Sequence, residues 1–516
     1  MTPDSHNSPA RPRVLVIGGG ISGLAAAHRL VELSDPSEQS LSISLWEQSD
    51  RLGGVLSTKH EEGLQIEESA DNFITTVPHG LNLCHRLGLA DQLTQTAPDS
   101  RRTFVVHRNR LHKLPDGFLM MAPTKMWPLA VTPLLSPWGK FRAGLEYFIP
   151  PKLDNQDESM ASFGCRRLGR QVFERMIEPL ISGVYGAEME RLSVLATMPR
   201  FRDMERDHGS LIRAMRFEMR KRKREAKKAK KATADRYESS STSGDATPKK
   251  TGSHQGEGGA RYSLFVTLRE GLSKLVDTLT DRLPDGCAQT GRVAKSLKRL
   301  ESNGHYVWEA MAEDGTVEQF DAVILATPSG TAATLLRDVD QKSSDMVAAI
   351  EHTGTAIATV AFNREQIGHP LDGAGFVVPS VENTPILAAS FSSIKYPHRA
   401  PEGKALIRIF AGGARAPEMA EMEDEKLLKT LLEGLRPLLR IEGEPYYSTV
   451  AHWPHTMPQY HVGHLDRIAQ LEKRIEAFQG FELAGNAYHG VGVPACIQSG
   501  EAAAERVLEE LGADQI

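Results

Sequence analysis

The chain has few cysteines, and they show no pattern that would build a disulfide framework or a metal site. Among its 516 residues there are four, Cys84, Cys165, Cys287 and Cys496, and they lie far apart along the chain. None of their spacings matches CxxC or a zinc finger. We therefore expect isolated thiols in a reducing compartment, with no disulfide and no metal.

Long apolar runs and an excess of basic charge are also lacking. Residues 118–150 come closest to a membrane span, but five prolines interrupt them, and a span needs roughly 20 apolar residues in a row. The polar residues 1–13 lack the apolar core of a signal peptide. A formal net charge of −5 creates no field that would attract nucleic acid. We expect a cytoplasmic globular protein that does not bind nucleic acid.

Residues 220–259 differ in composition from the rest of the chain. They begin with a dense run of lysine and arginine, continue through consecutive serines and end in glycine-rich sequence. Such a segment buries too little apolar surface to offset the entropy of ordering it. We predict a disordered insertion between folded segments; a nuclear-localisation or polyanion-binding segment is the alternative.

Alternating apolar and turn segments at the start of the chain predict a parallel sheet. Residues 14–17 are typical of a buried strand, residues 22–33 of a helix and residues 41–47 of a second strand. This is a βαβ unit. Apolar runs at 321–326 and 481–484 indicate two further strands, and if they join the same sheet its domain is assembled from separate chain segments.

Three glycines follow the first strand at the spacing Gly18-x-Gly20-x-x-Gly23. The first permits a tight turn, the second lets the backbone approach a pyrophosphate, and the third lets helix and strand pack closely. The helix N-terminus favours the phosphate charge. Glu47, at the end of the second strand, is placed to accept hydrogen bonds from an adenosine ribose. Together these features predict a dinucleotide site, although the glycine pattern alone is weak evidence.

The residues after Glu47 favour FAD over NAD. Arg51-Leu52-Gly53-Gly54 resembles the extended FAD motif of the amine oxidase and phytoene desaturase superfamily, in which this turn lies against the pyrophosphate. Near the other end, the glycine-rich stretch 483–494 precedes a helix expected to begin near Ala495. Backbone N–H groups at such a helix start suit a phosphate or an electron-rich flavin edge. The two motifs together predict a two-ended FAD site.

Two reactive side chains in the second motif have both a chemical and a structural interpretation. His489 suits a general base, but a histidine in a glycine-rich loop is more often structural. Cys496 suits a covalent flavin link, but a buried thiol at a helix start is commoner. We favour the structural interpretations and expect FAD to be bound non-covalently.

The C-terminal segment 484–500 resembles that of the porphyrinogen oxidases of haem biosynthesis, which comprise protoporphyrinogen IX oxidase and oxygen-dependent coproporphyrinogen III oxidase. Four further segments share the resemblance: 178–185, 262–265, 390–403 and 453–460. Ala495 departs from the acidic residue of many bacterial members, and the insertion is longer than the family pattern requires. The resemblance covers nearly all of the chain except these insertion residues and the segment before Arg11.

The resemblance implies an α/β fold with a Rossmann-like FAD-binding domain, a mixed-sheet substrate domain and a helical domain. The expected boundaries are 11–95, 260–330 and 445–512 for the FAD-binding domain, 96–112 and 331–444 for the substrate domain, 113–219 for the helical domain, and 220–259 for the insertion. The apolar start of the helical domain fits either a membrane contact or a core with a substrate channel, and we favour core and channel.

Motifs and resemblance together imply the site residues. FAD contacts are expected at Gly18, Gly19, Gly20, Ile21, Ser22, Gly23, Glu47, Gln48, Arg51, Gly53, Gly54, Ser69, Ala70, Asp71, Asn72, Val293, Trp453, Gly485, Val491, Gly492 and Val493. The Val293 backbone suits the adenine edge, unless it is an ordinary strand valine, and the Trp453 indole suits the flavin. For the substrate, the Gly183 carbonyl is expected to act as a catalytic helper by orienting a pyrrole N–H, Phe376 and Phe391 to pack on the macrocycle, and Arg101 or Arg102 to bind a propionate.

The implied reaction removes six electrons from a porphyrinogen in three two-electron steps at a flavin, with oxygen as acceptor and hydrogen peroxide as co-product. Coproporphyrinogen III is favoured over protoporphyrinogen IX, because the C-terminal segment looks closest to the soluble bacterial forms. A peripheral membrane contact and transfer of product to neighbouring haem-pathway enzymes are left open. The alternatives are an amine oxidase or desaturase of the same superfamily and a non-enzymatic escort protein on the same fold.

Overall fold

The apolar run at the start of the chain forms the centre of a parallel sheet in the computed structural model. The structure describes residues 11–34, 41–100, 102–119, 121–123, 125–221, 224–225, 227, 264–302 and 305–513. The sheet has the order β12 (Ala288–Gln289), β2 (Ser42–Trp46), β1 (Arg13–Ile17), β16 (Ala322–Leu325) and β22 (Phe481–Leu483). Val14, Leu15 and Val16 are fully buried, because both faces of the sheet are covered, and this explains why the strand has no polar alternation.

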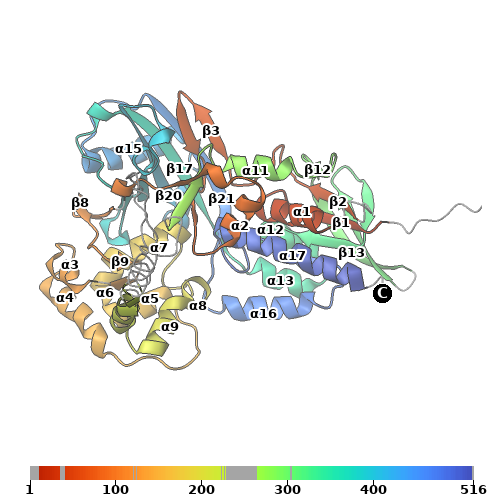
Figure 1. Ribbon diagram of the computed structural model, residues 1–516, viewed down its shortest axis with the longest axis horizontal. Helices are drawn as coiled ribbons and strands as arrows, with labels where there is room; N and C mark the ends of the chain where they lie inside the picture. The colour runs from red at the N-terminus through yellow and green to blue at the C-terminus, as the bar shows by residue number, and fades with distance from the viewer. Residues whose placement is uncertain are drawn as a thin grey trace, which may run out of the picture.

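Helices cover one face of this sheet, and helices with a small sheet cover the other (Figure 1). The first face packs against α1 (Ile21–Leu33), α2 (His79–Arg86), α11 (Ser273–Thr280) and α17 (Val493–Ala513). The second face packs against α12 (Ser329–Leu336), α13 (Gln341–Ala348), α16 (His464–Ile475) and the antiparallel sheet β13 (Ala294–Ser302), β14 (His305–Ala312) and β15 (Val317–Phe320). The expected α/β architecture is therefore confirmed.

The elements of this domain that the sequence predicted lie within two residues of their expected bounds. The first helix begins one residue before the expected start and the C-terminal helix two residues before it. The two distant apolar runs form β16 and β22, which pair in parallel, and β16 also pairs with β1. Strands from separate parts of the chain thus build one sheet, as expected.

The first and last long helices touch through their backbones. A Cβ atom at Gly500 of α17 would lie only 2.0 Å from the carbonyl oxygen of Ser22 in α1. The facing stretch Ala25–Ala27 of α1 is also small and buried. Small residues let the two helix backbones approach closely, and this contact places the N-termini of α1 and α17 beside the same sheet edge.

A seven-stranded mixed sheet forms the second layer of the molecule. Its order is β21 (Tyr447–Pro458), β17 (His352–Asn363), β20 (Lys404–Gly412), β19 (Ile386–Phe391), β18 (Gly375–Val377), β7 (Thr103–His107) and β8 (Arg110–Lys113). All pairs are antiparallel except β18 with β7. One face packs against α15 (Asp424–Leu439). The other face is turned towards α7 (Glu178–Tyr185), which leaves that side for a ligand site.

Short elements connect these layers. Three small antiparallel sheets comprise β3 (Thr58–Glu61) with β4 (Leu64–Glu67), β5 (Phe73–Ile74) and β6 (Leu93–Gln95) with β11 (Phe265–Leu268), and β9 (Phe118–Leu119) with β10 (Ala122–Pro123). Short helices are η1 (Ala90–Gln92), η2 (Pro98–Ser100), η5 (Arg364–Gln366), η6 (Ser380–Glu382), α14 (Ser392–Lys395), η7 (Pro397–Arg399), η8 (Gly413–Arg415) and η9 (Pro417–Glu421).

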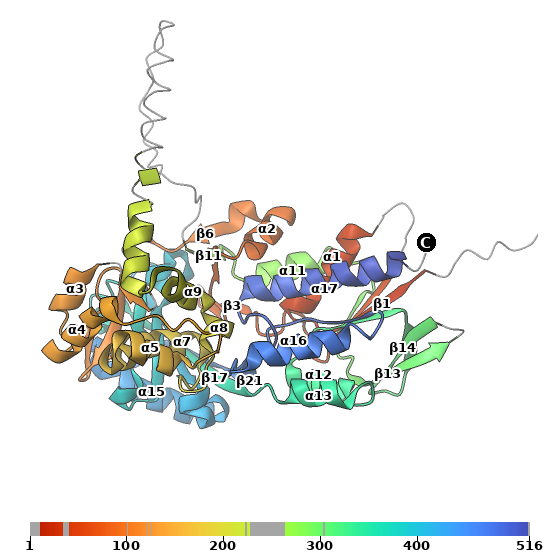
Figure 2. The same cartoon turned by 90° about the horizontal axis from the view of Figure 1, so that it is seen from below.

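A helical part lies at the opposite end from the parallel sheet (Figures 1 and 2). It contains α3 (Met126–Val131), α4 (Pro137–Gly144), η3 (Leu145–Phe148), α5 (Met160–Leu168), α6 (Arg170–Val172), η4 (Phe173–Ile177), α7, α8 (Val194–Thr197) and α9 (Pro199–His208), followed by helical residues 211–221. None of the helices in the described ranges is long and apolar enough to cross a membrane.

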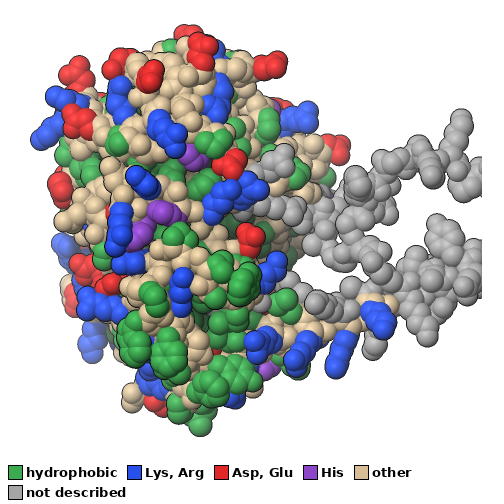
Figure 3. Space-filling view, turned by 90° about the vertical axis from the view of Figure 1, so that its left-hand side faces the viewer, with side chains coloured by type: hydrophobic (Ala, Val, Ile, Leu, Met, Phe, Trp, Pro, Cys, Tyr) green, Lys and Arg blue, Asp and Glu red, His purple; other side chains and the backbone are tan. Residues whose placement is uncertain are grey.

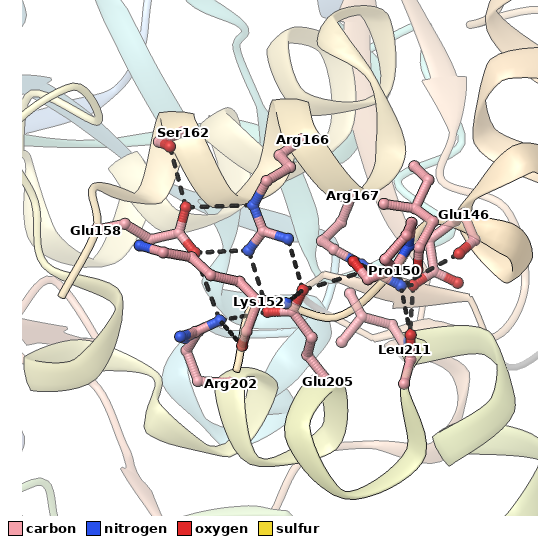
Figure 4. Close-up of polar contacts among 12 residues, drawn as sticks. Glu146, Pro150, Lys152, Glu158, Ser162, Arg166, Arg167, Arg202, Glu205 and Leu211 are labelled. Atoms are coloured by element: carbon pink, nitrogen blue, oxygen red, sulfur yellow. Dashed lines mark hydrogen bonds and ion pairs between the residues drawn. The ribbon is translucent and has the colours of Figure 1, made fainter. Parts of the chain in front are cut away.

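Buried ion pairs join the helices of this part (Figure 4). Arg167 and Glu146 are fully buried, and the Arg167 Nε donates to a Glu146 carboxylate oxygen at 3.0 Å. The same carboxylate accepts from the backbone N–H of Leu211 at 2.7 Å and so caps helix 211–221. Around this pair, Arg166 and Arg202 bind Glu158 and Glu205. Removing one partner of such a pair typically costs about 3–5 kcal/mol.

The apolar side chains at the start of the helical part are partly buried in the core and partly exposed at the surface. Leu129, Leu134 and Leu135 are buried, as the favoured core interpretation expects, but Trp127 and Trp138 are 76% and 73% exposed. Most of the predicted disordered insertion, 220–259, lies outside the described residues. Of that segment, Arg220 and Lys221 extend the helix. The domain boundaries stay predictions.

We predict that Gly500→Ala destabilises the protein by about 1–3 kcal/mol, because the new methyl group must displace the Ser22 carbonyl. Gly512→Ala is the matched control in the same helix, since a Cβ atom there has no neighbour within 4 Å in the described part of the chain. The control should be neutral or more stable by about 0.5–1 kcal/mol. Thermal unfolding of the two variants measures the difference, and equal stabilities would contradict the helix contact.

Candidate functional site

The glycine-rich turn between β1 and α1 leaves open space at one of its three glycines. A Cβ atom at Gly18, where φ is +108°, would lie 2.5 Å from the carbonyl oxygen of Ala326, and one at Gly23 would lie 1.8 Å from that of Gly18. A Cβ atom at Gly20 would meet no described atom within 4 Å. Packing within the chain therefore requires Gly18 and Gly23, whereas Gly20 borders a space that suits a pyrophosphate. Ile21 and Ser22 form the first turn of α1.

Glu47 is held at the end of β2 by the backbone around it. One carboxylate oxygen accepts from the Gly19 N–H at 2.6 Å and the other from the Ser49 N–H at 2.8 Å. The side chain is buried, while Gln48 is exposed. The Ser49 hydroxyl also donates to the second oxygen, at 2.6 Å. The oxygen that accepts from Gly19 therefore keeps acceptor capacity for a further donor such as a ribose hydroxyl.

The Arg51–Gly54 turn docks directly on the first glycine turn. The Gly53 N–H donates to the Gly19 carbonyl at 2.8 Å, and a Cβ atom at Gly54 would lie 3.2 Å from the Gly20 Cα. The Arg51 guanidinium donates to the carbonyls of Leu52, Gly54 and Leu56, which fixes the shape of the turn. The structure thus brings both N-terminal motifs together at one place.

The backbone around Val293 lies beside the Glu47 strand. The Arg292 N–H donates to the Glu47 carbonyl at 2.8 Å, and the Val293 carbonyl accepts from the Glu313 N–H at 2.9 Å. Val293 precedes β13. It is therefore near the expected ribose position, and its proposed adenine contact stays a prediction.

The C-terminal glycine-rich loop leads into α17, as expected. The Gly485 N–H donates to the Ser499 hydroxyl at 3.1 Å, and the Gly492 carbonyl accepts from the Cys496 N–H at 3.0 Å. Val491 precedes this turn and Val493 begins the helix. Burial raises the pKa of the Cys496 thiol to about 11, so this thiol is protonated near neutral pH and a poor nucleophile.

Tyr460 and His464 hold the C-terminal glycine-rich loop in place through hydrogen bonds to its backbone. Their rings are stacked with centroids 4.1 Å apart. The Tyr460 hydroxyl donates to the Asn486 carbonyl, and the His464 Nε2 bonds the Tyr488 carbonyl at 2.9 Å. Burial lowers the pKa of His464 to about 4. His464 is consequently a neutral donor that holds the loop in place.

The segment 69–72 lies between the parallel sheet and the seven-stranded sheet. The Trp453 Nε1 donates to the Glu68 carbonyl at 2.7 Å, and Arg408 donates to the Ser69 carbonyl. The Asp71 carboxylate pairs with Lys395 at 2.7 Å. Ala70 and Asn72 are half-buried beside it. Trp453 and this segment are therefore brought together, as the resemblance implies.

The expected substrate residues lie on different sides of the seven-stranded sheet. Gly183, in the last turn of α7, faces the sheet: a Cβ atom there would lie 3.8 Å from Val377 and 3.9 Å from Ala388. Phe376 and Phe391 are buried in the core on the α15 side. Because neighbouring residues of a strand point to opposite faces, Phe376 points away from Gly183. The structure does not bring these two rings together with Gly183.

Of the two arginines expected to bind propionates, the structure describes only Arg102. Arg101 lies outside the described residues. Arg102 has a side chain that is 56% exposed, and its guanidinium pairs with Asp372 at 2.7 Å. A propionate would have to compete with this carboxylate, and the anchoring role of both arginines stays a prediction.

The sheet face towards α7 carries residues that sequence reasoning missed. Cross-strand pairing runs from Val377 to Ala388, then to Phe410 and Ile357, across four strands. The strand period gives only part of the signal: Val377 follows Phe376 and must point to the other face, but the period does not tell which of the two faces α7. The apolar wall beside Gly183 is thus built from these residues rather than from Phe376 and Phe391.

Comparison with known proteins gives one family match over most of the chain. A model of flavin containing amine oxidoreductases matches residues 21–508. The coproporphyrinogen III oxidase of Propionibacterium freudenreichii subsp. freudenreichii is 34% identical over 498 residues, which cover 96% of this chain and 90% of the relative. That of Bacillus subtilis strain 168 is 32% identical over 505 residues, covering 98% and 99%.

A solved structure has the same fold over the full length. A crystal structure described as a protoporphyrinogen oxidase from Exiguobacterium sp. 255-15 is 26% identical and covers 98% of this chain and 100% of its own, with a TM-score of 0.80. The likeness therefore includes the parallel sheet, the seven-stranded sheet and the helical part.

We predict that His464 makes the protein less stable as the pH falls from about 6.5 to 4. Its folded-state pKa of about 4 lies below the unfolded value of about 6.5. Between these two pH values the imidazole is therefore protonated in the unfolded chain and neutral in the folded one. The loss reaches about 3 kcal/mol at pH 4 and is absent above pH 7. Chemical denaturation across this range measures it.

In the His464→Gln variant this part of the pH dependence should disappear, because glutamine does not titrate. His489→Gln is the control, since His489 is exposed and pairs with Glu472 at the surface. An unchanged slope in His464→Gln, matching that of the control, would show that His464 does not couple the fold to pH.

Proposed function

The chain belongs to the family of flavin containing amine oxidoreductases, and we propose that it is a porphyrinogen oxidase of haem biosynthesis that binds FAD non-covalently. The observation that carries the proposal is the identity of 34% to a coproporphyrinogen III oxidase over 96% of the chain. It supports coproporphyrinogen III as substrate in preference to protoporphyrinogen IX.

The described residues fit FAD at both ends of the site. Gly20 borders open space while Gly18 and Gly23 are closed, as an approaching pyrophosphate requires. Glu47 is oriented for the ribose, and the first turn of α17 supplies backbone N–H groups. The protonated, buried Cys496 supports a non-covalent complex. When bound at these residues, FAD would supply two-electron redox chemistry with oxygen as the final acceptor.

The residues of the sheet and of α7 position the substrate. Val377, Ala388 and Phe410 offer an apolar wall for a planar macrocycle. Gly183 lies in the last turn of α7, where carbonyl groups lack an N–H four residues on within the helix. Its carbonyl is therefore suited to accept a pyrrole N–H and hold it in one orientation.

The reaction balances over three cycles. A porphyrinogen loses six electrons and six hydrogens on becoming a porphyrin, and three molecules of oxygen take them up as three molecules of hydrogen peroxide. No strong acid–base pair is required, because the bridge hydrogens are labile and the pyrrole nitrogens are part of the substrate. The chain supplies orientation and electrostatics.

An aerobic assay with coproporphyrinogen III and protoporphyrinogen IX tests the proposal. We expect porphyrin fluorescence to rise with three equivalents of peroxide, faster with coproporphyrinogen. The control is Gly20→Leu: its side chain enters the open space rather than a packed region, so the protein should fold but purify colourless. Full flavin content in Gly20→Leu, or porphyrin formation no faster than in that variant, would contradict the proposal.

We also infer a peripheral membrane contact through the helical part. Hydrophobic side chains gather beside lysine and arginine side chains on the face drawn in Figure 3. The exposed hydrophobic side chains on α3, α4, η3 and the following loop include Trp127, Val131, Trp138, Phe141, Phe148 and Leu153, each at least 55% exposed. Arg213 and Arg216 of helix 211–221 stack over Tyr147, next to Phe148. Apolar side chains rimmed by basic ones suit an anionic lipid surface, from which product transfer to a neighbouring enzyme would be direct.

Sedimentation with lipid vesicles tests this contact. The protein should bind phosphatidylglycerol vesicles more tightly than phosphatidylcholine vesicles, and the double variant Trp138→Ser, Phe148→Ser should bind at least about tenfold more weakly. Leu33→Ser, which removes an exposed apolar side chain from the distant end of α1, is the control. Equal binding by all three proteins would exclude this surface.

A further inference from the structure

Three basic side chains surround Asp71 between the segment 69–72 and the seven-stranded sheet. Lys395 lies 2.7 Å from the Asp71 carboxylate, Arg399 3.4 Å and Arg408 3.6 Å. Arg399 also donates to the Asp71 backbone carbonyl at 2.7 Å. The three come from α14, η7 and β20, so the fold gathers charges that are distributed along the sequence. We refer to Asp71, Lys395, Arg399 and Arg408 as the cation cluster.

The cation cluster is buried and carries excess positive charge. The side chains of Arg399 and Arg408 are 0% and 1% exposed. Glu67 is the nearest further acid, 3.5 Å from Arg399, and its burial raises its pKa. Glu68 is paired with Lys59 instead, at 2.6 Å. Three cations therefore face at most two carboxylates.

Ion pairing with Asp71 alone does not account for this arrangement. One arginine would satisfy one carboxylate, and each additional buried cation costs desolvation energy. The Nε atoms of both Arg399 and Arg408 are buried, and among the described residues neither has a hydrogen-bond partner. Burial also lowers the pKa of Lys395, although Asp71 opposes this effect. The excess charge calls for a negative charge from outside the chain.

The cation cluster lies next to the segment and the tryptophan at which contacts with the flavin are expected. Arg399 and Arg408 are closed off, but Lys395 and Asp71 each keep 13% of their side-chain surface exposed. Trp453 donates to the carbonyl of Glu68, the residue before segment 69–72. Phe73, the residue after it, borders Gly80 together with Pro494 of α17: a Cβ atom at Gly80 would lie 3.0 Å from Phe73 and 3.2 Å from Pro494. Segment 69–72 and Trp453 are expected FAD contacts, and the indole of Trp453 is the one expected to pack on the flavin.

We propose that Lys395, Arg399 and Arg408 form a buried positive field, partly balanced by Asp71, that favours negative charge on the bound flavin ring. The inference rests on the proposed FAD site and goes beyond it, because it assigns a role to residues that bind neither phosphate nor substrate. Hydride transfer to a flavin increases its negative charge, so these residues make the removal of electrons from the substrate more favourable. They act through position and charge.

Variants of Lys395 test the field with flavin-loaded protein. Lys395→Met removes one charge, keeps the length of the side chain and leaves two arginines to pair with Asp71. A unit charge within about 10 Å at a partly buried site is worth about an order of magnitude in an equilibrium constant. We therefore expect about tenfold weaker binding of sulfite, which adds to flavins as an anion, and a two-electron reduction potential lower by about 30 mV.

Three further variants sharpen the test. Lys395→Arg should restore the sulfite affinity and the potential, because it restores the charge. Lys404→Met is the matched control: Lys404 lies on β20 with Arg408 but bonds Asn363 and stacks on Tyr446, away from Asp71. Arg408→Gln should shift both readouts in the same direction as Lys395→Met and provides the measurement if that variant does not fold.

The outcomes separate this inference from the proposed function. Wild-type protein that binds no flavin would overturn both. Wild-type and variant proteins that bind flavin with equal potentials and equal sulfite affinities would overturn the positive field alone. A fall in melting temperature without a change in potential would show that the cation cluster only joins the two sheets, which also overturns the inference.

Discussion

The close contact between α1 and α17 is the constraint on which the site depends. Gly500 leaves room for the Ser22 carbonyl, with a hypothetical Cβ atom only 2.0 Å away. The two helices begin at the carboxyl ends of strands in one parallel sheet, where ligands of open α/β sheets bind. Because this contact fixes both helix starts, the Gly18–Gly23 turn and the Gly485–Val493 loop lie at the same edge of the sheet, where the FAD site is proposed, although they lie at opposite ends of the chain. A larger residue at position 500 would separate two halves of a site whose own residues were unchanged.

Local rules were sufficient to predict the parallel sheet and the positions of the first glycine turn and of Glu47 on it. Glycine spacing, strand length and the acid at the end of the second strand depend on neighbours within about thirty residues, so β1, α1, β2 and the position of Glu47 follow from the sequence. The pairing of β16 and β22 with this sheet also agreed with their apolar, unalternating composition. These parts need no knowledge of how distant segments pack.

The substrate side could not be predicted equally well, because both faces of the seven-stranded sheet are covered. Phe376 and Val377 are both apolar, and sequence alone does not tell which of them faces α15. The basic residues around Asp71 were missed for a related reason: Lys395 and Arg408 look like ordinary surface charges until the strand register places Arg408 beside Ser390 and the turn of α14 returns Lys395 to the same carboxylate. Such a cluster exists only in the folded chain.

The two buried charge networks of this protein differ in a way that separates structure from function. In the helical part, Glu146, Glu158 and Glu205 face Arg166, Arg167 and Arg202, so three acids balance three bases and the carboxylate of Glu146 also caps a helix. In this network every buried charge has a partner of opposite charge within the chain, so no ligand is needed to neutralise it. Around Asp71 the same fold assembles more bases than acids, next to the segment at which FAD contacts are proposed. The helical part shows that buried bases in this fold can be matched by an equal number of acids, so the excess of bases around Asp71 is not a general feature of its buried charges. The residual charge around Asp71 is therefore best understood as the complement of a ligand whose own charge completes the site.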